Sequence, residues 1–259
     1  MLKTRLIAVL IVLEGQVVQS VRFKHTNVIH YDPIHAIEAF NKWAVDEIVV
    51  LNVARTPDDR CGFAEKVADI SRICFVPLSV GGWITDDGYA DLLLRSGADK
   101  LVVNSALHSQ PDLVRVLSKR YGKQCVVASM DVMRGGADIP TVRVDRGRVD
   151  TGSNALDWVN RAVDLGAGEI LFNSIDHDGA RRGYDVDTLK TIARSVDIPV
   201  IAFGGVLTWD HLMGGLDAGA DAVAVANQFH YTEQSTKKAK AFLARKNIIV
   251  RAEGRFGEA

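Results

Sequence analysis

The chain has 259 residues, of which 47% are hydrophobic and 24% charged, enough to bury a substantial core in one large domain or two small ones. Its 31 lysines and arginines nearly balance its 32 aspartates and glutamates, so the net charge is −1 and no global field draws the chain to nucleic acid or to an anionic membrane. Any site for an anion must therefore be local.

An apolar run near the start, Leu6–Val12, is too short to cross a bilayer, and no small-residue cleavage site follows it. We therefore interpret it as a strand. The three cysteines, Cys61, Cys74 and Cys125, are odd in number and lack CxxC spacing, so we expect reduced thiols, with Cys125 inside a strand as a small apolar residue. These features predict a cytoplasmic protein.

Short apolar, β-branched runs alternate with stretches whose apolar residues recur at three- and four-residue spacing. Eight such alternations predict an α/β fold, a single (β/α)8 TIM barrel over residues 1–251 with a C-terminal tail at 252–259. A doubly wound open sheet is the alternative, but no GxGxxG motif follows the first strand. The predicted strands are Leu6–Val12, Ile48–Asn52, Phe75–Val80, Leu101–Asn104, Val126–Asp131, Ile170–Ser174, Val200–Phe203 and Ala222–Ala226. The predicted helices are Pro33–Trp43, Gly62–Ile73, Asp87–Arg95, Pro111–Tyr121, Ala155–Asp164, Asp187–Val196, Trp209–Ala218 and Ser235–Lys246.

The two halves of the chain repeat each other. Glu47 matches Glu169, the segment from Pro77 to Gly82 matches the segment from Pro199 to Gly204, and Gly97-Ala98-Asp99 matches Gly219-Ala220-Asp221. All three pairs lie 122 positions apart. A repeat of this kind predicts a barrel built from two similar halves.

Glycine pairs follow two strands at equivalent places in the halves, where backbone N–H groups can approach an anion. Two such sites at one barrel mouth would suit a ligand with a phosphate at each end. Trp83 stands where the second half has Gly205, so the first phosphate site is narrowed or filled by its side chain. The alternative interpretation of both glycine pairs is that they only make tight turns. The predicted phosphate-binding residues are Gly81, Gly82, Asn104 and Ser105 in the first half, and Gly204, Gly205, Ala226 and Asn227 in the second.

Two strand ends bring acidic and polar groups to the same rim. Asp131 ends an apolar run and is the first candidate for a catalytic acid or base. The loop from Asn173 and Ser174 to Asp178 and Gly179 adds polar candidates for substrate binding, although such a cluster is often a simple turn.

No acidic twin faces Asp131. When the first strand is placed over the fifth, Ile11 falls on Asp131, 120 positions away, and isoleucine can neither accept nor give a proton.

At the opposite ends of the strands, four charged residues each precede an apolar run: Arg5, Glu47, Lys100 and Glu169. Two cations and two anions at the bottom of a barrel can pair into a ring across its axis. The conservative interpretation is a stabilising ion-pair layer, because residues at the bottom face of this fold usually serve stability.

Over essentially its whole length the chain resembles the HisF family, the cyclase subunit of imidazole glycerol phosphate synthase. The resemblance rests on segments at 3–8, 97–100, 166–171, 174–179, 183–185 and 219–222. It implies that a HisH-like glutaminase docks on the bottom of the barrel, that ammonia passes a charged gate formed by Arg5, Glu47, Lys100 and Glu169, and that a phosphorylated substrate reacts at the top. It implies no cofactor and no metal.

The chain departs from the family pattern at two places. The family uses two aspartates, and Asp131 matches one while Ile11 replaces the other; Gln19 stands where the family has a lysine. Loss of a positioned acid or base costs about 10²–10⁴-fold in rate, so ordinary cyclase activity should be impaired. Together with the segment from Val21 to Lys24, these residues resemble a branch associated with acetamidino-sugar formation in surface-polysaccharide (lipopolysaccharide) biosynthesis, in which a separate sugar amidotransferase takes part.

Three hypotheses follow. The first is an ammonia-conducting subunit that supplies nitrogen for amidation of a glycan precursor. The second is a cyclase in histidine biosynthesis that works with Asp131 alone. The third is a barrel that only docks and activates its glutaminase. In each, the glutaminase nucleophile is not in this chain, because no cysteine sits in a GxCxG elbow, so nitrogen comes from a partner or from free ammonia.

Overall fold

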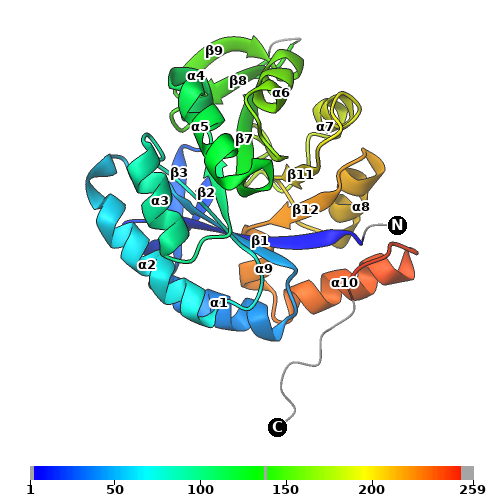
Figure 1. Cartoon of the computed structure of the whole chain (residues 1–259). Helices are drawn as coiled ribbons and strands as arrows, with labels where there is room; N and C mark the ends of the chain where they lie inside the picture. Colours follow the sequence, from blue (N-terminus) through cyan, green and yellow to red (C-terminus); the bar gives the residue numbers. More distant parts are fainter. Residues whose placement is uncertain (1–2, 137–138, 252–259) are drawn as a thin grey trace.

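The computed structural model describes residues 3–136 and 139–251, and within these ranges eight parallel strands close into a barrel surrounded by helices (Figure 1). Strand β1 pairs with β4 on one side and β12 on the other, and β7 pairs with β10, so the parallel sheet has no open edge. The predicted (β/α)8 barrel is confirmed, and the doubly wound alternative is excluded. The barrel strands are β1 (Arg5–Leu13), β4 (Glu47–Asn52), β5 (Leu78–Gly81), β6 (Lys100–Val103), β7 (Val126–Met133), β10 (Glu169–Ser174), β11 (Val200–Phe203) and β12 (Ala222–Val225).

Helices connect the strands, and local sequence sets where several begin. Asp32 precedes Pro33 and its side chain accepts a hydrogen bond from the Ile34 N–H, and Asp86 does the same for Tyr89, so both helices start at an acidic cap. The α-helices are α1 (Pro33–Lys42), α2 (Arg60–Ile73), α3 (Asp87–Arg95), α4 (Ala106–Ser109), α5 (Pro111–Tyr121), α6 (Ala155–Asp164), α7 (Val186–Ala193), α8 (Trp209–Asp217), α9 (Asn227–Tyr231) and α10 (Ser235–Arg245). Two 3₁₀ turns are η1 (Pro57–Asp59) and η2 (Lys123–Cys125).

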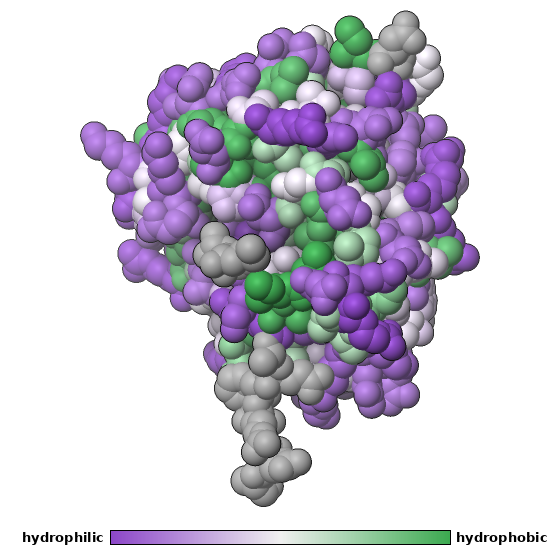
Figure 2. Space-filling model, turned by 90° about the vertical axis from the view of Figure 1, so that its right-hand side faces the viewer, coloured by the Kyte–Doolittle hydropathy of each residue, from purple (hydrophilic) through white to green (hydrophobic). Residues whose placement is uncertain are grey.

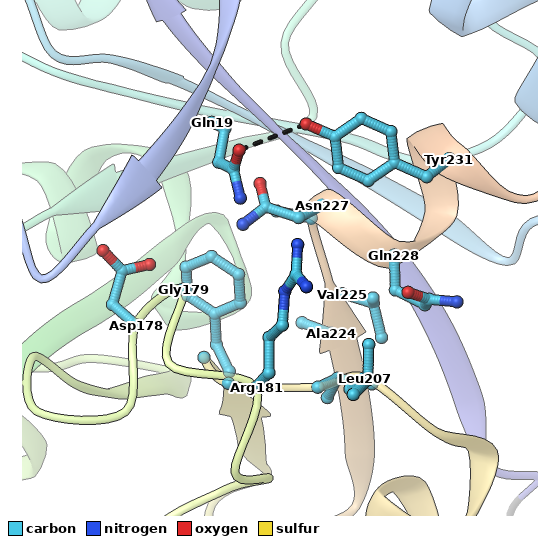
Figure 3. Close-up of a pocket in the computed structure, with 15 residues that line it drawn as sticks. Gln19, Asp178, Gly179, Arg181, Leu207, Ala224, Val225, Asn227, Gln228 and Tyr231 are labelled. Atoms are coloured by element: carbon cyan, nitrogen blue, oxygen red, sulfur yellow. Dashed lines mark hydrogen bonds between the residues drawn. The ribbon is translucent and has the colours of Figure 1, made fainter. Parts of the chain in front are cut away.

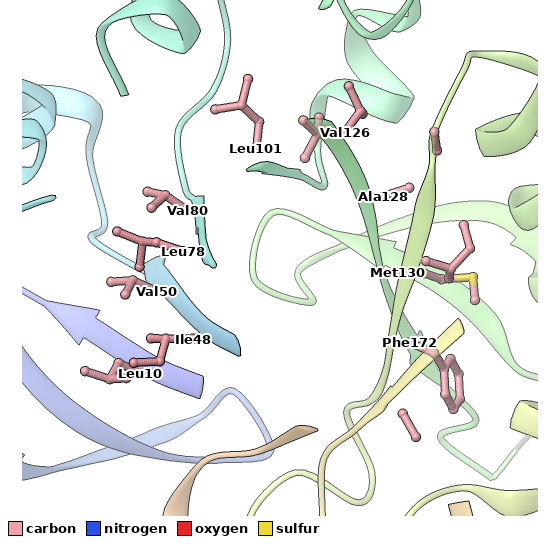
Figure 4. Packing of buried hydrophobic residues seen from close by; sticks show 14 of the residues in the cluster. Leu10, Ile48, Val50, Leu78, Val80, Leu101, Val126, Ala128, Met130 and Phe172 are labelled. Carbon is pink, nitrogen blue, oxygen red and sulfur yellow. The ribbon is translucent and has the colours of Figure 1, made fainter. Parts of the chain in front are cut away.

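The barrel strands are apolar on both faces because two hydrophobic layers sandwich them. Alternate residues point out to the helices, as Leu10, Val50 and Phe172 do in the outer layer (Figure 4). The residues between them point inward, and Ile11 and Leu171 belong to this inner layer, which lines the bore of the barrel. This double burial explains the continuous apolar runs in the sequence.

The two-fold repeat is present in the backbone. The Asp99 carboxylate accepts a hydrogen bond from the Leu78 N–H at 2.8 Å, and the Asp221 carboxylate accepts one from the Val200 N–H at 2.9 Å. Helices α3 and α8 begin and end 122 positions apart, as the repeat predicts. The equivalent residues Gly97 and Gly219 both have positive φ.

Two hairpins at the C-terminal ends of the strands were not predicted. One is formed by β2 (Gln16–Val21) and β3 (His25–His30), and the other by β8 (Thr141–Val144) and β9 (Val149–Asn154). The outer strands β3 and β9 are largely polar and exposed, and β2 and β8 are short. The first turn places Arg22 and Phe23 at φ of 50° and 57°, where glycine or asparagine would be the usual signal. The sequence therefore carried little sign of them.

Two details of the prediction were wrong. Phe75 is not in a strand but 73% exposed, and β5 begins at Leu78. Cys125 is buried, as expected, but it ends the turn η2 instead of lying inside β7. The predicted tail, residues 252–259, lies outside the described residues.

No helix in the described part is long and apolar enough to cross a membrane. The surface seen in Figure 2 is mainly hydrophilic, with hydrophobic side chains in separate small patches.

Candidate functional site

The four charged residues at the N-terminal ends of the strands form a closed ring, which we call the charged ring: Arg5, Glu47, Lys100 and Glu169. The Arg5 guanidinium lies 2.9 Å from the Glu47 carboxylate and 3.0 Å from that of Glu169. The Lys100 ammonium lies 3.0 Å from Glu47 and 3.1 Å from Glu169. Each charge thus contacts two opposite charges across the axis. Whether the ring acts as a gate for ammonia stays a prediction.

Above the charged ring the bore is apolar. Successive inward positions on β10 are Glu169, Leu171 and Asn173, and on β6 the inward Val102 lies between Lys100 and Asn104. Each step of two residues climbs about 6.6 Å along a strand, so the ring and the polar residues at the other end lie about 13 Å apart. A charged layer, an apolar layer and a polar layer follow one another along one axis.

Asp131 stands in the polar layer near the C-terminal end of β7. We call this end of the barrel, where the C-terminal ends of the parallel strands meet, the mouth. Its carboxylate accepts hydrogen bonds from the side-chain amides of Asn104 at 2.8 Å and of Asn173 at 3.0 Å. The structure therefore brings together three residues that the sequence proposed separately.

Burial raises the pKa of Asp131 against the hydrogen bonds from the two amides, which lower it, and with a smaller contribution from the nearby Asp178 the pKa comes to about 6. A carboxyl group with such a pKa exchanges a proton readily near neutral pH, which is what a general acid or base requires. Ile11 is 6% exposed and packs in the inner layer beside Leu51, so β1 offers an apolar side chain at this level.

Asp178 lies in the loop between β10 and α7 and is tied to the first hairpin. The Ser20 hydroxyl donates to its carboxylate at 2.5 Å, and the Phe23 N–H donates at 3.3 Å. Burial raises the pKa of Asp178, and these donors counteract it. Gly179 has φ of 63°, and a side chain there would collide with the Ser20 carbonyl, so the loop packs tightly against β2.

A pocket of about 280 Å³ opens at the mouth between the β10–α7 loop, β11 and β12. Six residues predicted for phosphate or substrate binding line it: Asp178, Gly179, Gly204, Gly205, Ala226 and Asn227. Three further lining residues are Gln19, Arg181 and Tyr231 (Figure 3).

Of these, Arg181 and Tyr231 were not found from the sequence. Arg181 comes two residues after the recognised Asp178-Gly179 pair, but an arginine in a polar loop gives no signal by itself. Tyr231 ends the five-residue helix α9, which no periodicity predicted.

The predicted residues of the first half are arranged differently. Gly81 and Gly82 lie where a side chain would meet the carbonyl oxygens of Val102 and Asn52, so close strand packing already requires glycine there. The Ser105 hydroxyl accepts a hydrogen bond from the Asp145 N–H at 3.1 Å, which ties it to the second hairpin. None of these three residues lines the pocket.

Trp83 marks the difference between the halves. It has φ of 56° where the equivalent Gly205 has φ of 86°, so a large residue occupies a left-handed conformation that favours glycine. Its indole N–H donates to the Ala54 carbonyl at 2.9 Å, and its ring packs against the outer layer.

Ser174 shares the strand face of Phe172, which packs in the outer layer, so the alternation of the strand places it away from the bore. Its carbonyl accepts the Asp178 N–H at 2.9 Å. Its contribution is to the shape of the loop.

In the described ranges, no three His, Cys, Asp or Glu side chains cluster so as to hold a metal ion. Cys61 is exposed on α2, Cys74 directly follows that helix and Cys125 is buried, and none of the three lines the pocket at the mouth.

Comparison with known proteins agrees with this architecture. The model of the histidine biosynthesis protein family matches residues 5–235. The chain is 38% identical to the imidazole glycerol phosphate synthase subunit HisF of Mycobacteroides abscessus, over 96% of this chain and 98% of that protein. It is 39% identical to the subunit of the same name from Salinispora arenicola, over 96% of this chain and 99% of that protein. With its barrel, its charged ring and its buried Asp131, the chain belongs to the histidine biosynthesis protein family and, within it, to the HisF proteins.

Proposed function

We propose that the chain is the synthase subunit of a glutamine amidotransferase complex, which docks a HisH-like glutaminase at the charged ring and conducts ammonia through the bore to Asp131. The observation that carries this proposal is the layering along one axis: a paired charged ring, an apolar bore and a buried carboxyl group. The names of the relatives support it, because they are subunits of imidazole glycerol phosphate synthase.

The apolar layer of the bore favours the passage of neutral ammonia over that of the ammonium ion. Moving an ion into a low-dielectric interior costs several kcal/mol even after relaxation, whereas neutral ammonia avoids that penalty. The charged ring supplies carboxylates that can keep the proton at the entrance. At the mouth Asp131, which is mostly ionised above pH 6, accepts the proton that nitrogen loses when it attacks a carbon of the acceptor.

Different observations support two different substrates as the acceptor of the ammonia nitrogen. The names of the relatives support a phosphorylated substrate closed into an imidazole, in histidine biosynthesis. Ile11 and Gln19 support amidation of a surface-glycan sugar, in which a separate sugar amidotransferase completes the chemistry and a second acid at the mouth is not needed.

Growth of a cyclase-deficient strain without histidine separates the two acceptors. Complementation at normal expression supports the cyclase, and failure combined with glutamine-dependent formation of an amidated sugar supports the second acceptor. An Ile11→Asp, Gln19→Lys double variant serves as the positive control, because it restores the two residues that differ from the family pattern.

The conducting role is tested at the charged ring. Lys100→Met unbalances the ring, so we expect the ratio of product formed to glutamine hydrolysed to fall, while product formed from added ammonium salt is retained because free ammonia enters at the mouth. An unchanged ratio contradicts the conducting role. It would leave the barrel as a scaffold that only docks and activates the glutaminase.

A further inference from the structure

Asn173 holds a buried hydrogen-bond acceptor that no described protein group uses. The residue is 2% exposed, and its Oδ1 atom has no hydrogen-bond partner among the described residues. Its Nδ2 atom donates to Oδ1 of Asp131 at 3.0 Å, which fixes the orientation of the amide, because the reverse orientation would set two oxygens against each other. A buried acceptor without a donor costs free energy, so this oxygen favours a ligand that supplies an N–H or O–H group.

The barrel does not require an amide at this position. The equivalent residue of the first half, 122 positions earlier, is Leu51, whose apolar side chain packs against the inner layer. The first half therefore completes the same level of its strand with a leucine. The amide of Asn173 serves a polar contact at the mouth, and the hydrogen bond to Asp131 uses only one of its two ends.

The free oxygen lies between the bore and the pocket at the mouth. Asn173 is the next inward residue above Leu171 on β10, and Leu171 belongs to the inner layer that lines the bore. A side chain at Gly204 would meet Oδ1 of Asn173, and Gly204 lines the pocket, so this oxygen packs against a glycine in the pocket wall. Phe203, in register with Asn173 on the neighbouring strand, adds an apolar wall. A molecule that leaves the bore on this side passes the oxygen before it reaches the pocket.

The surroundings of this oxygen select a small donor. Neither Asn173 nor Asp131 lines the pocket of about 280 Å³, and both are buried, so a large ligand in the pocket contacts other groups first. Ammonia has three N–H donors and one lone pair. One N–H can bind Oδ1 of Asn173 and another the Asp131 carboxylate, because each carboxylate oxygen accepts one amide N–H and keeps a further lone pair. The lone pair of the nitrogen then stays free to face the pocket.

We infer that Asn173 and Asp131 together form a binding site for ammonia at the upper end of the bore, in which the Asn173 carbonyl oxygen accepts one N–H and the carboxylate accepts another. The inference rests on the proposed function for the source of the ammonia, and it adds the place where the nitrogen is held before it reacts. It also gives the two asparagines different roles. Asn104 donates to Asp131 at 2.8 Å as well, but its own Oδ1 accepts the Ser105 hydroxyl at 3.5 Å.

Direct binding of ammonia tests the inference in the full chain, without a glutaminase or an acceptor substrate. Ammonium chloride is titrated at about pH 9, where much of the added nitrogen is neutral ammonia and Asp131, with a pKa of about 6, is ionised. NMR follows the side-chain amide of Asn173 and the carboxyl carbon of Asp131. We expect both signals to shift and to saturate, whereas sodium chloride at the same concentrations leaves them unchanged.

Two leucine variants separate the roles of the asparagines. Each removes one amide donor from Asp131, but only Asn173→Leu also removes the free oxygen. Asn173→Leu should weaken ammonia binding, followed at the Asp131 carboxyl carbon, about 10-fold, as expected for loss of one hydrogen bond. Asn104→Leu is the matched comparison, since it keeps the oxygen, and it should weaken binding by less than about threefold.

Signals that fail to saturate in the wild type up to about 0.5 M ammonia, or equal losses in the two leucine variants, overturn the inference and leave the oxygen to a water molecule. An equal response at about pH 7, where nearly all of the nitrogen is ammonium, overturns the assignment to neutral ammonia. The conducting role fails separately, because its readout is the coupling ratio in Lys100→Met and this titration uses no glutamine. Circular dichroism of each variant verifies that it is folded.

Discussion

The two ends of the barrel differ in how far their polar side chains find hydrogen-bond and ion-pair partners within the protein. At the charged ring every carboxylate and every cation has two partners inside the protein, and the Ser79 hydroxyl adds a further hydrogen bond to Glu47 at 2.8 Å. At the mouth, the buried oxygens Oδ1 of Asn173 and Oδ1 of Asn227 have no hydrogen-bond partner among the described residues. The ring is complete without a ligand, whereas the mouth has polar groups that a ligand can satisfy.

The largest effect is expected when a member of the charged ring loses its charge, and it is an effect on the stability of the whole protein. Lys100→Met leaves the buried carboxylates of Glu47 and Glu169 with one cation, so we expect a loss of about 3 kcal/mol in the free energy of unfolding, measured by urea denaturation. Lys119→Met, at an exposed position on α5, is the control and should change stability by less than about 0.5 kcal/mol. Equal effects would show that the ring does not stabilise the barrel.

Asp131→Asn should change stability in the opposite direction and stabilise the protein, because burial at the mouth disfavours the ionised Asp131 carboxylate. The pKa of Asp131 is about 6 in the folded protein and about 3.9 in an unfolded chain, so the folded state binds the proton more tightly. Stability is therefore greatest below pH 4 and falls as the pH rises to about 6.

Well above pH 6 the full penalty applies, and removing the charge should stabilise the protein by about 3 kcal/mol. The difference in urea midpoint between wild type and Asp131→Asn, followed from pH 4 to 8, measures this effect. A difference that does not change with pH would show that Asp131 has an ordinary pKa.

Ser20→Ala is expected to have the smallest effect on stability. It removes the hydroxyl that donates to the Asp178 carboxylate, so the pKa of Asp178 should rise further and stability should fall by about 1 kcal/mol. Titration of the Asp178 carboxyl carbon by NMR measures the pKa directly. A Ser20→Thr variant, which keeps the hydroxyl, should restore the wild-type value, and failure to do so would assign the change to packing.

The barrel was predictable from the sequence because its strands are buried on both faces and its helices are amphipathic. The repeat could be recognised because the Asp99 and Asp221 contacts demand the same residue at the same place in each half. The charged ring was predictable because one charge immediately precedes the apolar run of each of four strands, and parallel strands bring those positions to one end.

The mouth was harder to predict because hairpins and loops build much of it. Gln19 was noted as a departure from the family pattern, but its orientation depends on Tyr231, a residue 212 positions later in a short helix. Gly82 matches Gly204 in the repeat, yet a side chain at Gly82 would meet the Asn52 carbonyl oxygen and one at Gly204 the side-chain oxygen of Asn173. That difference depends on packing that no local pattern encodes.

The charged ring also bears on how the barrel assembles. Arg5, Glu47 and Lys100 belong to the first half of the repeat, and Glu169 belongs to the second, 164 residues after Arg5. Three members can therefore gather while the first half folds, but their excess positive charge is balanced only when Glu169 arrives. A misaligned union of the halves would leave this carboxylate without its cations at the cost of its desolvation. The pairing of Glu169 with Arg5 and Lys100 therefore favours the register in which the two halves are joined in the native barrel.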